Sequence, residues 1–421
     1  MISKIFSLTG LAAGILFFIG CSGSKPAGPP IFSPADMNNP AARQKVAEAY
    51  INAKDIEKLN GVKKVIIPAF NVEFITQSSG TATSSDYKKG TASVTNIYSL
   101  AGLDTAMLQA IADDLHTKLV DKLKASGIDV VSVSELTSAE AYTAMSFEDT
   151  PRKGKSYLDK GKARSLTFAP KDMKVYYTAG DPFAPMTSAF GQAFKGASGK
   201  ANNNMEAKLM KDFNADAMLK VRYVAGFAEI DKKTSKSVNK VSAKVSASMG
   251  FSLAIGSNRL VFTKGFTESP KPGKKDEFVY TPSGEITSVD LKLPITSDAP
   301  IVSEVVESTS TWGKISNVLS VVIGSLSGGV FTKYTFDAKV DNDTYKKTSV
   351  DYIGTFNELA IEQLKLAPPA LAAPPEPAAI EATTEEADPA EQAEEAKPAE
   401  EAQEKAAPEA APAEAEPAPA E

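Results

Sequence analysis

The stretch VSAKVSASMGFSLAI, residues 241–255, alternates between apolar and small or polar residues without a break. Its apolar positions are Val241, Ala243, Val245, Ala247, Met249, Phe251, Leu253 and Ile255. Because successive side chains of a β-strand point to opposite faces, this pattern predicts one long strand with a single apolar face. Either the helices of a two-layer domain or the lipid of a membrane must cover that face.

The segments on both sides of this stretch also have strand patterns. Leu219, Val221, Tyr223, Ala225 and Phe227 are apolar at alternate positions, with Lys220, Arg222 and Val224 between them. The segment DKKTSKSVNK (231–240) predicts a loop, and Gly256-Ser257-Asn258 predicts a turn into RLVFTKGF at 259–266. The three segments together predict an antiparallel meander.

Amphipathic helices are predicted before and after the meander. Asp104 can cap a helix whose apolar residues recur every three or four positions, and Gly127 suits the left-handed position after its last turn. The apolar stripe of this helix is Leu108, Ile111, Leu115, Leu119 and Leu123. Similar stripes predict helices at Ile315, Val318, Leu319, Val322, Ile323 and Leu326, and at Tyr352, Ile353, Phe356, Leu359, Ala360 and Leu364.

These segments indicate a fold class. The continuous apolar run Val65-Ile66-Ile67 predicts a strand that is covered on both faces. Every helix and every meander strand has one apolar side, so we expect them to pack together. We therefore predict an α/β domain over residues 41–366: a mixed sheet with an antiparallel meander packed against amphipathic helices, with a basic loop insertion around 150–203. Such packing covers the apolar face of residues 241–255 without lipid.

The amino-terminal end has the composition of an export signal. Residues 1–20 contain one lysine, an apolar run of about 15 residues and a small residue before the only cysteine, as in a secretory signal peptide. The run is shorter than the roughly 20 residues of a membrane-spanning helix. Residues 21–40, rich in Ser, Pro, Gly and Asn, predict a flexible tether.

The segment Ile19-Gly20-Cys21 resembles the lipobox of bacterial lipoproteins, although Phe18 replaces the preferred leucine. The resemblance implies that Cys21 is lipidated and becomes the mature amino terminus. Ser22 is compatible, by the same resemblance, with sorting to the outer membrane. We therefore expect a protein that is lipid-anchored in the outer membrane and faces the periplasm.

The carboxyl-terminal end, residues 367–421, is rich in Ala, Pro and Glu. It holds fifteen acidic residues and two lysines, a net charge of −13 in a chain whose total is −6, so the remainder of the chain is basic. A segment with so little apolar surface cannot offset the entropy lost on ordering, so we predict a disordered acidic tail.

Signals for catalysis are weak. His116 is the only histidine and lies near the edge of an apolar helical stripe, which indicates a structural role. Residues 191–200 (GQAFKGASGK) have glycines at phosphate-loop spacing, but Ala197 and Ser198 stand where Lys and Ser or Thr are required. The segment DNDTYKK at Asp341 lacks the glycine and the distal glutamate of a calcium loop. We predict no catalytic residue, no metal site and no cofactor.

Four segments carry a family resemblance: VKKVIIPAF (62–70), the helix and strand at 108–136, MKDFNADAMLKVRYVAGFAEID (210–231) and VSASMGFSLAIGSNRLVFTKG (245–265). Their order resembles the curli-secretion (CsgG-like) lipoproteins and their relatives, which include the amino-terminal domain of the Tol-system propeller protein (TolB-like). Pore-forming members insert a membrane hairpin where this chain has only residues 231–240, too few for two membrane strands of roughly 9–11 residues. Residues 264–311, rich in charge and proline, predict an exposed loop.

The resemblance implies a relative that forms no pore. We expect a non-catalytic outer-membrane lipoprotein that acts as a scaffold, assembly factor or activator in a cell-envelope complex. Its expected partners are the membrane, through the lipid anchor, and envelope proteins or peptidoglycan, with no nucleic acid and a possible homo-oligomer. Two alternatives remain at this stage: a protomer of an oligomeric secretion pore, and an envelope hydrolase that works through carboxylates.

Overall fold

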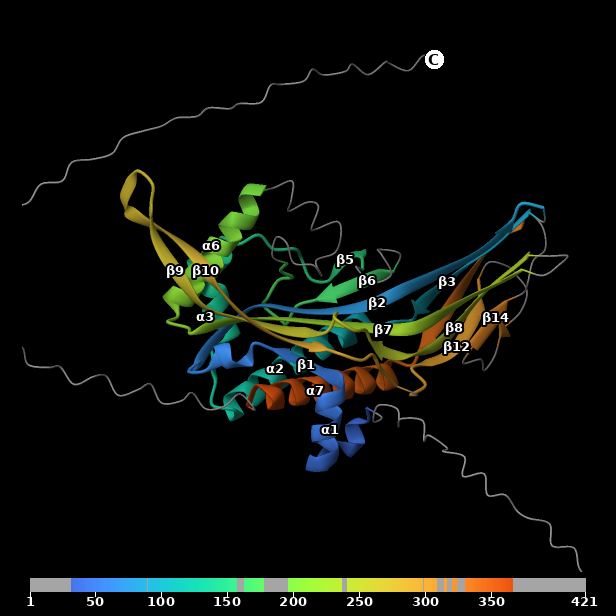
Figure 1. The fold of residues 1–421 in the computed structure, drawn as a ribbon, viewed down its shortest axis with the longest axis horizontal. Helices are drawn as coiled ribbons and strands as arrows, with labels where there is room; N and C mark the ends of the chain where they lie inside the picture. Colours follow the sequence, from blue (N-terminus) through green and yellow to red (C-terminus); the bar gives the residue numbers. More distant parts are fainter. Residues whose placement is uncertain are drawn as a thin grey trace, which may run out of the picture. The chain divides into compact units, whose positions relative to one another are not determined.

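The computed structural model describes residues 32–88, 90–156, 163–177, 196–236, 241–297, 299–308, 314–315, 320–323 and 330–365 (Figure 1). These residues form a mixed α/β fold, in which one large sheet of parallel and antiparallel strands carries helices on both faces. The predicted fold class is confirmed. The predicted signal peptide (1–20), Cys21 and the acidic tail (367–421) lie outside the described residues.

The helical segments are η1 (Pro34–Asn38), α1 (Pro40–Tyr50), η2 (Ile56–Leu59), α2 (Thr105–Ala125), α3 (Val133–Ser138), α4 (Glu140–Thr143), α6 (Gly196–Asp212) and α7 (Asn342–Lys365). The strands are β1 (Ile51–Lys54), β2 (Lys64–Asp86), β3 (Gly90–Ala101), β4 (Asp129–Val130), β5 (Arg152–Lys155), β6 (Arg164–Phe168), β7 (Ala217–Lys236), β8 (Val241–Leu253), β9 (Arg259–Lys271), β10 (Lys274–Leu291), β11 (Ile295–Thr296), β12 (Val302–Glu307), β13 (Lys314–Ile315), β14 (Ser320–Ile323) and β15 (Val330–Val340).

The sheet is built around β2. Its main path runs β1-β10-β9-β7-β2-β3-β15-β12-β13, with β7 parallel to β2 and β15 parallel to β3. Val65 and Ile67 of β2 contact the apolar cluster that includes residues of α2 and α7, and Ile66 contacts the cluster that includes residues of α3, α4 and α6. The apolar run in β2 is therefore covered on both faces, as predicted.

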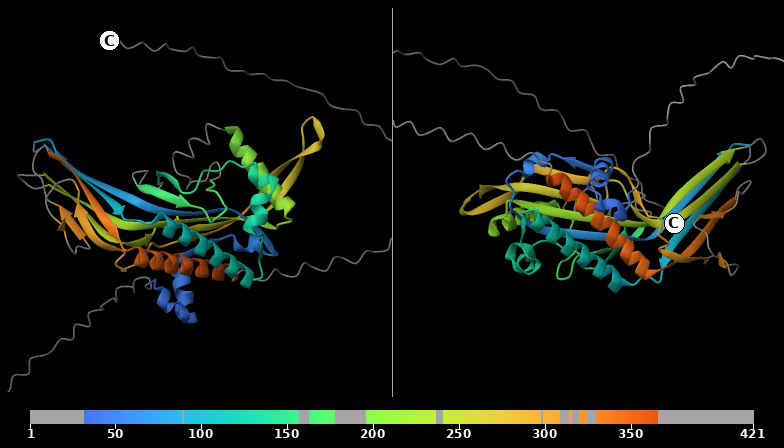
Figure 2. Two further views of the ribbon diagram at one scale, coloured as in Figure 1. Left: turned by 180° about the vertical axis from the view of Figure 1, so that it is seen from behind. Right: turned by 90° about the horizontal axis from the view of Figure 1, so that it is seen from below.

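Helices α2 and α7 lie side by side against one face of the sheet (Figure 2). Asp104 caps α2, its Oδ1 accepting a hydrogen bond from the Ala106 N–H at 2.9 Å, and Gly127 follows with φ 84°. The predicted stripe of α2 is fully buried: Leu108, Ile111, Leu115, Leu119 and Leu123. Ile353, Phe356, Leu359 and Ala360 of α7 are buried in the same cluster, so both helix predictions are confirmed.

Two different layers cover the apolar face of β8. Every odd residue from Val241 to Leu253 is buried, although the strand ends there and Ile255 is 56% exposed. Phe251 packs against α7, its ring centroid 5.8 Å from that of Tyr352. The first half of the strand instead packs against apolar residues of β2 and β3, strands that are not its ladder partners. The predicted helices therefore cover only half of this face, and the sheet covers the other half by folding over itself.

A glycine permits this close approach between strands. An ideal Cβ on Gly80 of β2 would overlap the Ile230 side chain of β7 and lie 3.2 Å from Cγ1 of Val245. The Asn96 side chain of β3 also joins the two layers, donating to the Val245 carbonyl at 3.1 Å. The folded-over part of the sheet thus combines apolar packing with a buried hydrogen bond.

The predicted turn at Gly256-Ser257-Asn258 does not complete a three-stranded meander. β8 and β7 form a hairpin as expected, but β9 pairs with the first half of β7 rather than with β8. β8 and β9 are therefore consecutive antiparallel partners of one long strand. Asn258 fills the junction: its Oδ1 accepts from the Val224 N–H at 2.9 Å, and its Nδ2 donates to the carbonyls of Val224 at 3.3 Å and Ala254 at 3.1 Å. These hydrogen bonds pair main-chain groups at the point where the ladder partner of β7 changes from β9 to β8.

Two other predictions about the second half of the body were wrong. The helix expected over 315–326 is absent from the described part of that segment, where β13 and β14 are strands and β14 pairs with β8. The exposed loop expected from residue 264 is an antiparallel ribbon of β9 and β10, although most of its outer residues are exposed. The partner of β14 lies far away in sequence, so local composition does not report that pairing. β9 and β10 are consecutive strands of one hairpin, and their content of charge and proline resembles that of a loop.

The predicted tether and basic insertion also differ from the structure. Phe32 and Met37 are buried, and Phe32 packs against Tyr50 with ring centroids 5.3 Å apart, so the folded body begins before residue 41. The insertion around 150–203 contains β5, β6 and the start of α6, and β6 pairs with β2. Residues 157–162 and 178–195 of this insertion lie outside the described residues. No helix in the described part of the chain is long and apolar enough to cross a membrane.

Candidate functional site

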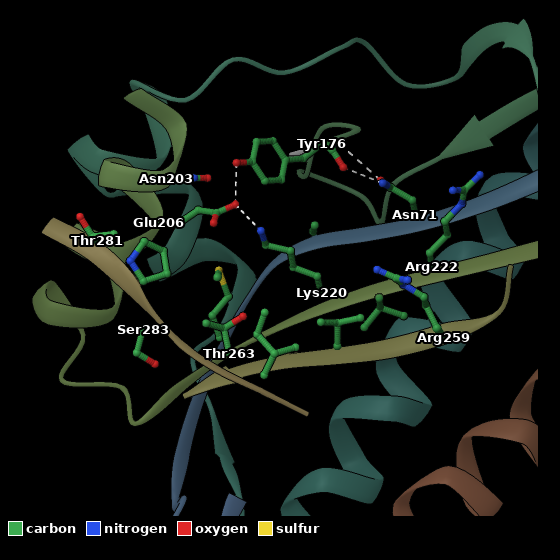
Figure 3. A pocket seen from close by; sticks show the side chains of 16 residues that line it. Asn71, Tyr176, Asn203, Glu206, Lys220, Arg222, Arg259, Thr263, Thr281 and Ser283 are labelled. Atoms are coloured by element: carbon green, nitrogen blue, oxygen red, sulfur yellow. Dashed lines mark hydrogen bonds and ion pairs between the residues drawn. The ribbon is translucent and has the colours of Figure 1, made fainter. Parts of the chain in front are cut away.

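A cavity of about 320 Å³, lined by charged, polar and apolar residues, lies on the face of the sheet opposite α2 and α7 (Figure 3). Strands β2, β7 and β9 form its floor, and β10, α6 and the segment around Tyr176 form its walls. On β7, Leu219 and Tyr223 belong to the core that α2 and α7 share. The alternation of the strand therefore directs Lys220 and Arg222 into the cavity.

Strand register places polar groups in one row across the floor. Arg222 of β7 is the direct antiparallel partner of Arg259 on β9. Asn71 of β2 pairs with Arg222 on one side, and Asp290 of β10 pairs with Arg259 on the other. Directly opposed side chains on one face have Cβ atoms about 5 Å apart. Two arginines therefore stand next to each other in the middle of the sheet.

Carboxylates hold the cations of the floor. Arg222 Nη2 lies 2.7 Å from Glu73 Oε2, and both side chains are buried, 6% and 0% exposed respectively. Lys220 Nζ lies 2.6 Å from Glu206 Oε1, which α6 brings over the sheet. A buried ion pair costs desolvation of both charges, so its geometry has to be maintained by the surrounding fold.

Tyr176 closes the cavity from above. Its hydroxyl donates to Glu206 Oε1 at 2.6 Å, and its main chain bonds Asn71: Asn71 Nδ2 donates to the Tyr176 carbonyl at 2.7 Å. The Tyr176 N–H donates to Asn71 Oδ1 at 3.4 Å. Figure 3 shows these contacts linking the floor, the tyrosine and α6. The cavity is thus bounded by a network of fixed hydrogen bonds.

The electrostatic environment keeps the tyrosines protonated. Burial raises the pKa of Tyr176 well above its usual value, and the negative charge of Glu206 raises it further. Burial also raises the pKa of Tyr177, with Glu73 acting in the same direction. At the other end of the arginine row, burial raises the pKa of Asp290, while the charge of Arg259 opposes the shift. The hydroxyls therefore serve as hydrogen-bond donors rather than as bases.

The residues singled out from the sequence mostly lie elsewhere. His116 of α2 packs against Phe70, with ring centroids 5.1 Å apart, on the opposite face of the sheet. Burial lowers its pKa, while the charge of Asp113 acts in the opposite direction. Asp341 precedes α7, where its Oδ1 accepts from the Thr344 N–H at 3.0 Å. Cys21 lies outside the described residues.

The predicted basic insertion contributes neutral wall residues to the cavity. Tyr176 and Asn203 of that segment line the wall, whereas the cations come from β7 and β9. Sequence patterns did not identify Glu206, Arg222 or Arg259 as members of one site. Lys220 and Arg222 did offer a signal, because they are charged positions on the second face of a strand covered on both sides.

Comparison with known proteins identifies no relative: no family model, no curated protein and no solved structure matches the chain. The resemblance to the curli-secretion group therefore stays a prediction. Within the described ranges, no group of three or more His, Cys, Asp or Glu side chains is placed to bind a metal ion.

Proposed function

We propose that the protein is a lipid-anchored outer-membrane lipoprotein, facing the periplasm, that acts without catalysis as a scaffold, assembly factor or activator in a cell-envelope complex. The sequence around Cys21 supports the anchor. The observation that carries the proposed scaffold role is the projecting ribbon, residues 264–285 of β9 and β10, which extends beyond the rest of the sheet (Figure 1).

Contacts with α6 hold the base of the ribbon. Lys211 Nζ donates to the Tyr280 hydroxyl at 2.6 Å and to Glu268 Oε1 at 3.1 Å. Asn204 Oδ1 accepts from the Tyr280 N–H at 2.6 Å. The orientation of the ribbon is therefore fixed by its neighbours rather than by its two strands alone, which would be marginally stable in isolation.

The outer part of the ribbon presents apolar side chains to solvent. Phe278 is 44% exposed and Val279 is 38% exposed, and Phe278 pairs across the ribbon with Pro270. Glu277 and Lys271 lie beside them and form an ion pair of 2.6 Å. Aromatic and apolar groups bordered by charge are typical of a protein-binding surface, and a ribbon edge also offers unpaired main-chain groups to a partner strand.

Site-specific photocrosslinking in cells tests this proposal. A photoreactive phenylalanine analogue at position 278 of the full-length chain should give a discrete adduct with another envelope protein. The control is the same analogue at Tyr87, a fully exposed aromatic residue at the tip of the β2–β3 hairpin. The scaffold proposal fails if position 278 yields no adduct, or yields the same adducts as position 87. Fractionation of a Cys21→Ser variant tests the anchor separately, since that variant should leave the membrane fraction.

A further inference from the structure

We infer that the cavity of Figure 3 is a binding site for a sugar that carries an oxyanion, a carboxylate or a phosphate. This inference is independent of the scaffold role, because Phe278 and Val279 of the outer ribbon do not line the cavity, although Thr281 and Ser283 at the base of the ribbon do. The cavity volume of about 320 Å³ lies at the small end of the range of roughly 300–1,000 Å³ found for ligand sites.

The opposed arginines carry the argument for an anion. Arg222 and Arg259 are direct cross-strand partners, and like charges in that position destabilise a sheet unless something compensates them. Glu73 lies beside Arg222 and Asp290 beside Arg259, each on the outer side of the pair. Both arginines line the cavity, and Figure 3 shows the guanidinium group of Arg259 turned toward its interior. Arginine presents several N–H groups in a plane, which suits a carboxylate or phosphate.

Lys220 is the third cation of the cavity and extends its positive surface along β7. Lys220 lies two residues before Arg222 and so faces the same cavity. Its partner Glu206 is 1% exposed and is also fixed by the Tyr176 hydroxyl, so the carboxylate is held as an acceptor at the upper wall. A ligand in the cavity would meet cations on the floor and an acidic acceptor above them.

Neutral polar groups line the end of the cavity away from the arginines. Asn203 lies on α6, Thr263 on β9, and Thr281 and Ser283 on β10 (Figure 3). Hydroxyl and amide groups can both donate and accept, which matches the hydroxyls of a sugar, while Met218, Pro282 and Ile286 nearby can contact its C–H groups. The division into a cationic end and a hydroxyl-binding end therefore favours an acidic sugar over a simple inorganic anion.

Binding can be measured by calorimetry on the full-length protein in detergent, with four probes: glucuronate, glucose 6-phosphate, glucose and inorganic phosphate. At least one of the two charged sugars should bind at least tenfold more tightly than glucose and than inorganic phosphate, a difference of about 1.4 kcal/mol. The relative affinity of glucuronate and glucose 6-phosphate distinguishes a carboxylate ligand from a phosphate ligand. The inference is overturned if neither charged sugar binds more tightly than glucose, or if inorganic phosphate binds as well as both.

Two cavity variants and one control variant localise the binding. Arg259→Met should weaken the charged sugar at least tenfold, whereas Arg164→Met, an exposed arginine of β6 outside the cavity, should leave its affinity unchanged. Thr281→Val removes a wall hydroxyl from an exposed position and should weaken the sugar severalfold while sparing inorganic phosphate. It serves as the test if Arg259→Met does not fold. Equal affinity in the wild type and in the folded cavity variants would place binding elsewhere and refute the inference.

Discussion

Replacing Asn258 with alanine should destabilise the sheet at the point where β7 changes partner. The Asn258 side chain is fully buried and bonds both the N–H and the carbonyl of Val224 and the carbonyl of Ala254. Alanine leaves one buried donor without a partner and removes one bond from each of two carbonyls. An unsatisfied buried group costs about 1–3 kcal/mol, and carbonyls tolerate the loss better, so we expect a total of about 3 kcal/mol.

Urea denaturation followed by circular dichroism measures this effect. With a slope near 3 kcal/mol per molar, the midpoint should fall by about 1 M. The neighbouring Ser257→Ala is the matched control, because Ser257 is buried to a similar degree and should change stability by less than about 1 kcal/mol. Equal midpoints for Asn258→Ala and the wild type would refute the role of Asn258 at this junction.

Three further predictions concern other buried features. Glu73→Gln should cost about 3–5 kcal/mol by leaving Arg222 buried without its carboxylate, whereas Glu73→Leu combined with Arg222→Met should recover most of the loss in the same denaturation assay. Gly80→Val should cost about 1–3 kcal/mol by forcing apart the two layers at Ile230 and Val245, and an unchanged melting temperature would argue against that contact. Because burial lowers the pKa of His116 in the folded protein, the unfolded chain takes up the proton more readily, so stability should fall as pH drops below about 6.5. The His116→Gln variant should not show this loss of stability between about pH 7.5 and 5.5. An identical loss of stability in the wild type and the variant would contradict the role of His116.

The sequence predicted the parts of the fold that depend on local periodicity. The stripe Leu108 to Leu123 and the alternation in β8 both report which side of an element is buried, and the structure confirms them. Periodicity does not report which element packs against the buried side. The pattern of β8 is the same at Val245, which faces strands, and at Phe251, which faces α7.

Long-range pairing explains two of the predictions that failed. Gly256-Ser257-Asn258 has the composition of a turn, but whether β9 returns along β8 or continues beside β7 depends on the bonds of Asn258 to Val224. Val322 and Ile323 fit a helical stripe equally well, yet they lie in a strand because β8 provides an edge for it. Sequence patterns did not predict the cavity for a similar reason. Arg222 and Arg259 become neighbours only through strand register, and Glu206 reaches Lys220 only after α6 packs over the sheet.

Helices and strands of the described body cover the apolar face of β8, and we propose that this body works as a scaffold on a lipid anchor. Light scattering on a Cys21→Ser chain without residues 1–20, purified in the absence of detergent, tests this most directly. We expect a folded particle with the mass of one chain or a few chains. Aggregation that only detergent relieves, with a large ring appearing in the detergent, would contradict it and favour the pore alternative.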